Sequence, residues 1–340
     1  MRQVWITKAG PPDVLKPRDG PTPQPGPGEV RIAVEAIGVN FADVVGRLGV
    51  YRDAPKIPYV PGYEVAGRID ALGAGVDDAL LGQDVIALAR FGGYSEMICV
   101  PAAQTFARPA AMPVEQAAGF SVAYLTAYAG LIAQARIQAG DHVLIHAAAG
   151  GLGLAAVAIA RRAGATIYGT ASPGKHEFLR EQGVQHPIDY RNQDFERAVM
   201  DRTGGRGVQI ALDSIGGRSW MKSYRTLAPT GRLVITGVTA LAPGARRSWW
   251  GLLKFMLTTP WLRFNPASLA NDNKSVSGVN MAMLWDQVDL LRGWMDDLMA
   301  WYADGTLPVH VDRVFPLDAA ADAHRYLHER KNVGKVILTP

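Results

Sequence analysis

The sequence contains a single cysteine, Cys99, among its 340 residues. One cysteine cannot form a disulfide within the chain, so a disulfide framework is excluded and a reducing compartment is indicated. The surrounding residues, YSEMICVPA, are typical of a strand. Because a lone cysteine is usually a small buried apolar residue, we assign Cys99 no catalytic role.

Blocks of like charge are also missing. The chain has 35 basic and 31 acidic residues, a net charge of +4, and no run of five or six like charges. This distribution gives little support to nucleic-acid binding, and we expect no nucleic-acid partner. Apolar residues make up 48% of the chain and charged residues 19%, which is the balance of a globular rather than a disordered protein.

Long apolar runs and hydrolase motifs are absent as well. The N-terminus lacks the apolar stretch of a signal peptide, and the most apolar run, Trp249 to Leu262, is interrupted by Lys254 and Pro260. We therefore expect a cytoplasmic protein. No serine stands in a G-x-S-x-G motif and no Cys/His pair offers a nucleophile, which argues against a hydrolase.

The length of the chain, and a change in composition and hydrophobic pattern along it, predict two domains. Residues 1–122 are rich in Pro and Gly and carry short alternating runs such as EVRIAVEAIGV, which are typical of strands joined by tight turns. Over residues 123–305, apolar strands alternate with glycine loops and helical segments. This alternation predicts a parallel sheet covered by helices. Residues 306–340 return to strand and short helix, and we expect them to rejoin the first domain.

The segment IHAAAGGLGLAAVAIARRAGA, residues 145–165, resembles the G-x-G-x-x-G fingerprint of a dinucleotide site. Ala148 takes the first place, Gly150 the second and Gly153 the third, with Gly151 as an extra glycine. The second glycine lets the backbone approach a pyrophosphate, and the third lets helix and strand pack closely. The alternative is a tight turn in an ordinary α/β domain. The apolar strand before the loop and the Ala- and Val-rich helix after it favour nucleotide binding.

The end of the second strand predicts which nicotinamide cofactor binds. An NAD site normally places an acid there to bind the ribose 2′-hydroxyl. This strand instead ends at Ala171 and Ser172, and Lys175 follows. A hydroxyl and a cation suit a 2′-phosphate, and Tyr190 and Arg191 are placed to close over the adenine end. We therefore predict NADP(H) as the cofactor. The alternative is that Lys175 is a solvated side chain at a helix start and has no role in cofactor binding.

Five segments, AIGVNFADVVGRLGVY, PYVPGYEVAGRI, AYLTAYAGL, HAAAGGLGLAAVAIARRAGA and ERKNVGKVIL, cover most of the chain in one order. Together they resemble the zinc-independent medium-chain dehydrogenases/reductases, specifically the quinone oxidoreductase branch and its VAT-1-like subgroup. The resemblance implies a GroES-like, β-rich catalytic domain and a Rossmann domain with a doubly wound parallel sheet. The active site would lie in the cleft between them, and the protein would be a homodimer.

Alcohol dehydrogenases of this superfamily hold a catalytic zinc with Cys and His. The corresponding places here are Asn40 and Tyr63, the third ligand's region AAGFSVAYLTAY contains no cysteine, and the four-cysteine structural lobe is missing. Zinc needs three or four suitable ligands. His324 and His328 lie four residues apart on a predicted helix without a third ligand nearby, and we expect both at the surface. No zinc site is expected.

Without a metal, reduction of an unactivated carbonyl loses its Lewis acid. A conjugated acceptor, such as a quinone or an enone, needs only hydrogen-bond donors where negative charge develops, each contributing ~3 kcal/mol at best. The candidate donors are Asn40, Tyr51 and Tyr63. Asn40 is equally suited to cap the helix FADVVGRLG, with Asp43 at its third position, and the two roles are compatible. Tyr51 is favoured as the proton donor or substrate-side contact, although a tyrosine in a Gly- and Pro-rich loop is also suited to simple packing.

The resemblance carries over further cofactor neighbours, each of which is equally suited to be a turn or cap residue. They are Thr126, Leu152, Ser214, Gly237 and Asn332. The predicted function is NADPH-dependent, zinc-free reduction of quinones or α,β-unsaturated carbonyl compounds. One alternative is a VAT-1-like, membrane-associated binding protein with weak or no turnover. The other is an alcohol dehydrogenase, which the missing zinc ligands argue against.

Residues 240–275 form an inserted segment that is longer than the quinone reductase pattern usually allows. A helical stripe of apolar side chains runs through it, flanked by three arginines; these residues are Trp249, Leu252, Leu253, Met256, Leu257, Arg246, Arg247 and Arg263. We favour a helix packed on the cleft or on a second subunit, or a substrate lid. A membrane-surface contact is less favoured because few basic residues flank the apolar stripe. VAT-1-like proteins resemble this segment, which keeps a membrane-associated role open.

Overall fold

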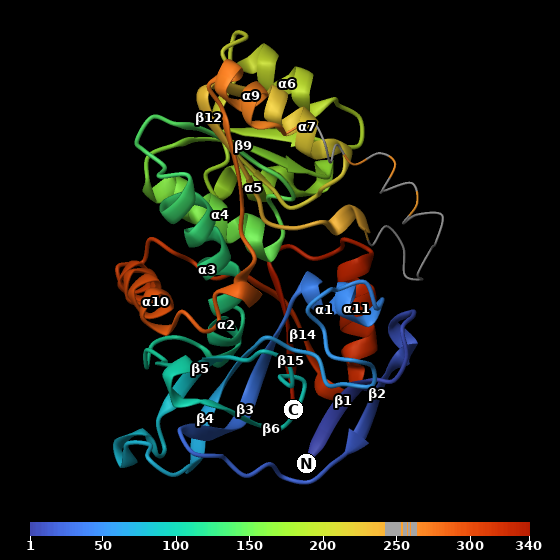
Figure 1. Cartoon of the computed structure of the whole chain (residues 1–340), viewed down its shortest axis with the longest axis vertical. Helices are drawn as coiled ribbons and strands as arrows, with labels where there is room; N and C mark the ends of the chain where they lie inside the picture. Colours follow the sequence, from blue (N-terminus) through green and yellow to red (C-terminus); the bar gives the residue numbers. More distant parts are fainter. Residues whose placement is uncertain (242–252, 254–256, 258, 260–263) are drawn as a thin grey trace.

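The computed structural model describes residues 1–241, 253, 257, 259 and 264–340 (Figure 1). The inserted segment thus lies largely outside the described residues, including Trp249, Leu252, Met256 and the three flanking arginines. Of its apolar stripe, only Leu253 and Leu257 are described, and both side chains are exposed.

A six-stranded parallel sheet forms the upper half of the molecule in Figure 1. Its strand order is β10-β9-β8-β11-β12-β13, which is the 3-2-1-4-5-6 order of the dinucleotide-binding doubly wound fold. The predicted alternation of strands and helices is therefore confirmed. The strands are β8 (His142–Ile145), β9 (Thr166–Ala171), β10 (His186–Asp189), β11 (Val208–Asp213), β12 (Leu227–Ile235) and β13 (Ser275–Gly278).

Helices connect and cover these strands. Helix α4 begins directly after the glycine loop, and its Ala, Val and Ile side chains are buried. Helix α6 begins where the Asp194 carboxylate accepts a hydrogen bond from the Glu196 backbone N–H, as expected for an N-cap. The helices of this half are α3 (Ser121–Tyr128), η4 (Ala129–Gln134), α4 (Gly151–Arg162), η5 (Pro173–Lys175), α5 (His176–Glu181), α6 (Phe195–Arg202), α7 (Arg218–Arg225), η6 (Thr239–Leu241), α9 (Pro266–Asp272), η7 (Met281–Met283) and α10 (Val288–Ala303).

The lower half is a mostly antiparallel sheet of order β14-β15-β3-β4-β5-β7, with β6 paired to β3. Strands β14 and β15 come from the end of the chain, and Val336 of β15 pairs with Val39 of β3. The end of the chain therefore shares a sheet with β3, while the predicted division into domains stays a prediction. The strands are β3 (Glu29–Val39), β4 (Glu64–Leu72), β5 (Asp84–Leu88), β6 (Met97–Pro101), β7 (Thr105–Ala107), β14 (Val311–Pro316) and β15 (Lys335–Thr339), beside the hairpin of β1 (Arg2–Ile6) and β2 (Leu15–Asp19).

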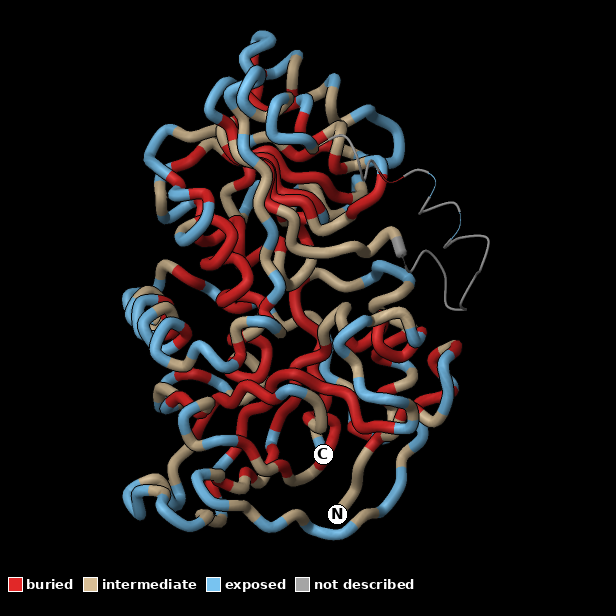
Figure 2. Tube along the Cα trace, in the orientation of Figure 1, coloured by how far each residue is buried: buried red, intermediate tan, exposed pale blue. Residues whose placement is uncertain are grey.

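Short helices complete this half: α1 (Phe41–Arg47), α2 (Val114–Ala118), α11 (Ala320–His328), η1 (Pro12–Val14), η2 (Asp78–Leu80), η3 (Ala102–Gln104) and η8 (Leu317–Ala319). Figure 2 shows buried residues running through both sheets and through the helices between them. One core cluster includes Ala36 and Phe106 from the lower sheet and Val143 and Ile145 from the upper one. The domain boundaries at residues 122 and 305 stay predictions.

The prediction of two surface histidines is wrong. His324 is fully buried and its Nε2 lies 3.0 Å from the Tyr94 hydroxyl, while half-buried His328 lies 3.3 Å from the Arg47 guanidinium. Residues four apart share one face of a helix. In α11 that face packs on α1, so both rings point inward rather than to solvent.

Candidate active site

The glycine loop lies between β8 and α4. A Cβ atom on Gly153 would stand 2.3 Å from the Ala147 carbonyl oxygen, so only glycine allows this close packing of helix on loop. The loop is tied to the end of β9, because Thr170 Oγ1 accepts from the Ala147 N–H at 3.1 Å and the Thr170 carbonyl accepts from the Ala148 N–H at 3.0 Å. Helix α4 therefore begins at a fixed place, with its first N–H groups available to an anion.

The chain just before β15 lies against this loop. The Gly334 N–H donates to the Ala149 carbonyl at 2.8 Å, and the Asn332 side chain donates to the Gly334 carbonyl at 2.8 Å. Lys175 donates to the carbonyls of Asn332 and Arg330 at 2.5 and 2.9 Å. The structure thus brings Asn332 and Lys175 together beside the glycine loop, while partly buried Leu152 packs against the core.

Three cationic side chains gather where β9 and β10 end. Ser172 directly follows β9 and Lys175 lies three residues on, with burial lowering the pKa of Lys175. Tyr190 follows β10, and hydrogen bonds from Arg330 and Arg191 lower the pKa of its hydroxyl although burial raises it. Arg330 is absent from the sequence prediction. Its position past the end of α11 gave no signal that it would reach a tyrosine 140 positions earlier in the chain.

The carboxyl ends of β11 and β12 bring two further predicted residues together. A Cβ atom on Gly237 would lie 3.2 Å from the Ser214 carbonyl oxygen, which accepts from the Thr239 N–H. The neighbouring Thr236 hydroxyl is buried and has no hydrogen-bond partner in the part of the chain that the structure describes. Thr126 differs, because its hydroxyl already donates to the Val122 carbonyl of its own helix at 2.6 Å. An orphaned hydroxyl and a glycine directly after β12 suit a nicotinamide nucleotide.

A buried ion pair lies next to the glycine loop. Glu64 is fully buried, and its Oε1 accepts from Lys335 Nζ at 2.7 Å and from Asn40 Nδ2 at 2.9 Å. Its other oxygen accepts from the Ser121 hydroxyl and the Val122 N–H. The Asn40 Oδ1 accepts from Lys335 at 2.8 Å. The amide of Asn40 is therefore held by this cluster.

Asn40 also begins α1, as the sequence predicts. Its backbone N–H donates to the Asp43 carboxylate at 2.8 Å, with Asp43 at the third helical position. Asp43 is buried, and this burial raises the pKa of its carboxyl to about 7. The helix-start role of Asn40 is confirmed, and its role toward a substrate stays a prediction.

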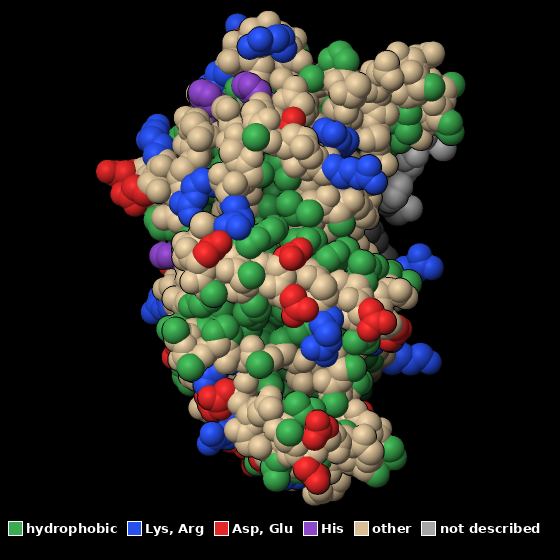
Figure 3. Space-filling model, turned by 90° about the vertical axis from the view of Figure 1, so that its left-hand side faces the viewer, with side chains coloured by type: hydrophobic (Ala, Val, Ile, Leu, Met, Phe, Trp, Pro, Cys, Tyr) green, Lys and Arg blue, Asp and Glu red, His purple; other side chains and the backbone are tan. Residues whose placement is uncertain are grey.

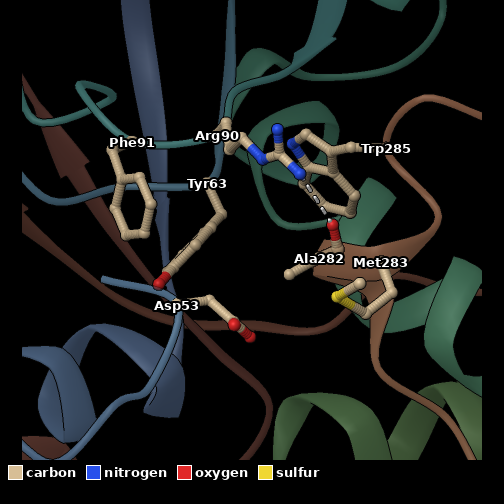
Figure 4. A pocket seen from close by; sticks show the side chains of 7 residues that line it. All are labelled: Asp53, Tyr63, Arg90, Phe91, Ala282, Met283 and Trp285. Atoms are coloured by element: carbon tan, nitrogen blue, oxygen red, sulfur yellow. Dashed lines mark hydrogen bonds between the residues drawn. The ribbon is translucent and has the colours of Figure 1, made fainter. Parts of the chain in front are cut away.

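Tyr51 and Tyr63 lie together, with ring centroids 6.2 Å apart and an edge-to-face angle of 77°. Burial raises the pKa of both hydroxyls. Tyr63 lines a cavity of about 300 Å³ between the two halves, shown in Figure 4. The cavity-lining residues are Asp53, Tyr63, Arg90, Phe91, Ala282, Met283 and Trp285. Asn40 and Tyr51 are not among them, although Glu64, which accepts from Asn40, directly follows Tyr63 in the chain.

Hydrophobic side chains gather across the middle of the face shown in Figure 3, and charged side chains lie above and below them. Met283 and Leu290 are among the exposed large apolar residues of the chain. No group of three or more His, Cys, Asp or Glu is placed to hold a metal within the described ranges. No helix among the described residues is long and apolar enough to cross a membrane.

The chain is similar in sequence to known proteins. Residues 26–110 match the family described as the alcohol dehydrogenase GroES-like domain, and residues 182–338 match the family described as zinc-binding dehydrogenase. The chain is 39% identical over its whole length to the synaptic vesicle membrane protein VAT-1 homolog of Rattus norvegicus, and it covers 84% of that protein.

Two solved structures are similar as well. The Escherichia coli quinone oxidoreductase complexed with NADPH has a TM-score of 0.87 and 28% identity, with full coverage of both chains. The CurK enoyl reductase has a TM-score of 0.83 and 33% identity, over 99% of this chain and 98% of that one. A GroES-like unit beside a Rossmann sheet defines the medium-chain class of oxidoreductases. The chain belongs to this medium-chain dehydrogenase/reductase family, and within it to the VAT-1-like quinone oxidoreductase branch.

Proposed function

We propose that the protein is an NADPH-dependent, zinc-free oxidoreductase that reduces quinones or α,β-unsaturated carbonyl compounds. The observation that carries this proposal is an aromatic cavity lined by Tyr63, together with a glycine loop whose adenine end is basic. Solved relatives include a quinone oxidoreductase complexed with NADPH and an enoyl reductase.

The residues present fit NADPH. The N–H groups at the start of α4 are placed to hold the pyrophosphate, because Gly150 and Gly153 keep the loop backbone open and close to the helix. In this proposal Ser172, Lys175 and Arg330 would hold the 2′-phosphate, since the end of β9 carries no acid that would repel it. When bound, NADPH supplies a hydride from its nicotinamide ring.

The tyrosine pair supplies the remaining chemistry. A conjugated acceptor that receives a hydride develops negative charge on its carbonyl oxygen, and the Tyr63 hydroxyl donates a hydrogen bond to that oxygen. Burial raises the pKa of Tyr63 above its ordinary value near 10, so the hydroxyl keeps its proton throughout the neutral range. Tyr51 packs edge-to-face against the Tyr63 ring, with centroids 6.2 Å apart, and orients it.

The proposal extends to assembly and location. Strand β13 pairs with β12 along one edge and, among the described residues, has no strand on the other. This open edge supports a homodimer, because unpaired strand edges are ready to pair with another chain. A cytoplasmic location remains part of the proposal.

Following NADPH absorbance with a quinone panel and an enone panel tests the function. We expect turnover with at least one panel, a preference for NADPH over NADH, and no loss of rate when a chelator is added. Chelator-sensitive alcohol oxidation would contradict the zinc-free proposal. A preference for NADH would contradict the role given to Lys175.

Replacing Tyr63 with Phe is expected to lower kcat about 100-fold, because the change removes one donor from the charged transition state while keeping the ring. The KM for the substrate should change by less than about threefold if the hydrogen bond is made mainly in the transition state. Steady-state kinetics measure both. The matched control is Tyr326→Phe, because the Tyr326 hydroxyl donates to Asp312 away from the cavity. An unchanged kcat in the Tyr63 variant would remove Tyr63 from the reaction.

The curated relatives' name, synaptic vesicle membrane protein, favours a second candidate, which is a membrane-associated binding protein with weak or no turnover. Co-sedimentation with liposomes separates the two. NADPH binding without turnover, together with co-sedimentation, would support the second candidate instead of the enzyme.

A further inference from the structure

One residue of the glycine loop has a backbone conformation that is unusual for its type. Ala147 lies in the left-handed region with φ +50°, and it is exposed, so close packing does not hold it there. Glycine adopts this region without strain, whereas a Cβ atom is disfavoured in it. Ala148, which stands in the first glycine place of the fingerprint, does not share this conformation. The position that calls for a glycine is therefore Ala147, one residue earlier.

The conformation of Ala147 sets the course of the loop. Its carbonyl oxygen accepts from the Gly150 N–H at 2.9 Å, which closes the turn ahead of α4. The same oxygen is the nearest atom to a Cβ built on Gly153, in the first turn of that helix. A change of Ala147 to the right-handed or extended region would turn this carbonyl and shift the first N–H groups of α4.

A chain of buried side chains holds Ala147 in place. Thr170 Oγ1 accepts from the Ala147 N–H at 3.1 Å and lies 3.2 Å from Nδ1 of His146. Nε2 of His146 lies 2.9 Å from the Ser223 hydroxyl, which donates to the Asp213 carboxylate at 2.7 Å. These four side chains belong to residues that are at most 5% exposed. The Ala147 N–H is thus the first donor of a chain that ends on a buried carboxylate.

The protons of this chain have one consistent arrangement. A carboxylate only accepts, so the single Ser223 hydroxyl proton goes to Asp213, and the Ser223 oxygen accepts from His146 Nε2–H. Burial lowers the pKa of His146 although the Asp213 charge raises it, and the imidazole stays neutral. Its Nδ1 is then an acceptor that takes the Thr170 hydroxyl proton. The Thr170 oxygen therefore faces the Ala147 N–H as an acceptor, in a series of aligned bonds that strengthen one another.

The far end of the chain is anchored beside the next strand of the sheet. Fully buried Asp213 ends β11 and also accepts from the Ile215 and Gly216 N–H groups at 2.8 and 3.2 Å, and from the Ser219 hydroxyl at 2.7 Å. These bonds fix the loop after β11, which begins at Ser214. The chain therefore joins the glycine loop after β8 to the loop after the neighbouring strand.

We infer that Thr170 and His146 are positioning residues for the nucleotide: their hydrogen bonds hold Ala147 in the conformation that a glycine would adopt unaided, and so keep the glycine loop shaped for a pyrophosphate. This inference rests on the proposed function, in which the loop binds NADPH. It makes the hydroxyl at position 170 necessary only where residue 147 carries a Cβ atom.

Removing the hydroxyl and then the Cβ atom tests this dependence. Thr170→Val keeps the branched side chain, and we expect it to weaken NADPH binding about fivefold to tenfold in a fluorescence titration. Adding Ala147→Gly to Thr170→Val should return the dissociation constant to within about twofold of the wild-type value, because glycine needs no hydroxyl to hold this conformation. His146→Phe, which removes the acceptor for the Thr170 proton, should weaken binding about threefold.

Two matched controls separate this effect from the loss of any buried hydroxyl. Thr170→Ser keeps the hydroxyl and should bind NADPH within about twofold of the wild type. Thr203 is also 2% exposed, and its hydroxyl accepts from the Gly207 N–H at 3.0 Å, just before the opposite end of β11. Thr203→Val should therefore lower the midpoint of thermal unfolding without weakening NADPH binding.

Thermal unfolding without nucleotide gives a second readout. Ala147→Gly should raise the midpoint by about 2 °C in the wild type, because the strain of a left-handed Cβ is removed. The gain should be less than half as large in the Thr170→Val background, where Ala147 has already relaxed.

Three results would overturn the inference: wild-type NADPH affinity in Thr170→Val or His146→Phe, an equal loss of affinity in Thr203→Val, or no recovery in the double variant. Failure of the wild type to bind NADPH would instead contradict the proposed function. The unfolding midpoints then decide whether Thr170 holds Ala147. An equal gain from Ala147→Gly in both backgrounds would overturn that hold, and a smaller gain in Thr170→Val would support it.

Discussion

Replacing Lys335 with Met is expected to lower the free energy of unfolding by about 3–5 kcal/mol. Lys335 is 5% exposed and its ammonium contacts the carboxylate of fully buried Glu64 at 2.7 Å. Removing the cation leaves a carboxylate that is buried away from water, and the hydrogen bonds from Asn40, Ser121 and the Val122 N–H do not neutralise its charge. Chemical denaturation followed by circular dichroism measures the change.

Lys331→Met is the control for this prediction. Lys331 pairs with Glu329, but the side chains are 61% and 44% exposed, and exposed pairs contribute about 0–1 kcal/mol. The double variant Lys335→Met/Glu64→Gln should recover part of the loss, because no buried charge then remains. A loss at Lys335 no larger than the loss at Lys331 would show that the buried pair contributes no more than a surface one.

Substituting Ala for Gly153 is the second large effect that we expect. The new Cβ would meet the Ala147 carbonyl oxygen at 2.3 Å and the Ala148 carbonyl carbon at 2.6 Å. Both are backbone atoms, so α4 must move away from the loop, at a cost of about 3 kcal/mol or more in stability. The same movement misdirects the first N–H groups of the helix. NADPH affinity, measured by fluorescence titration, should fall about 100-fold or more.

Gly174→Ala tests the specificity of this effect. A Cβ at Gly174 meets no atom within 4 Å, although the residue lies in η5, between Ser172 and Lys175 at the adenine end. Its stability and NADPH affinity should stay close to the wild-type values. Wild-type NADPH affinity in the Gly153 variant would mean that the nucleotide does not use this loop.

The sequence predicted the Rossmann half well because its signals are local. Each strand is a short apolar run followed by a glycine or a polar cap, and β8, the glycine loop and α4 fall where the fingerprint predicts them. The helix start at Asn40 also follows from a local rule, since Asp43 three positions on completes the hydrogen bond to its N–H. Contacts between residues only a few positions apart can be predicted from one sequence.

Contacts between residues far apart in the chain could not be predicted in the same way. Lys335 and Glu64 are separated by 271 positions, and their only signal was a lone charge at the edge of each apolar strand, in PGYEVAG and VGKVIL. Arg330 reaches Tyr190 because the chain before β15 returns to the glycine loop. His324 is buried because α11 packs on α1. Helical spacing placed both histidines on one face, but the partner of that face depends on the tertiary fold.

The return of β15 to β3 has a consequence for synthesis of the protein. Strand β3 ends at Val39, whereas β15 occupies residues 335–339, so β3 lacks this neighbour until residue 339 has left the ribosome. Glu64 likewise has no cation beside it until Lys335 has been synthesised. Until then the nascent chain carries an unpaired strand edge and an uncompensated acid, and unpaired edges promote aggregation. Premature termination before residue 335 would leave the first half of the protein in that state permanently.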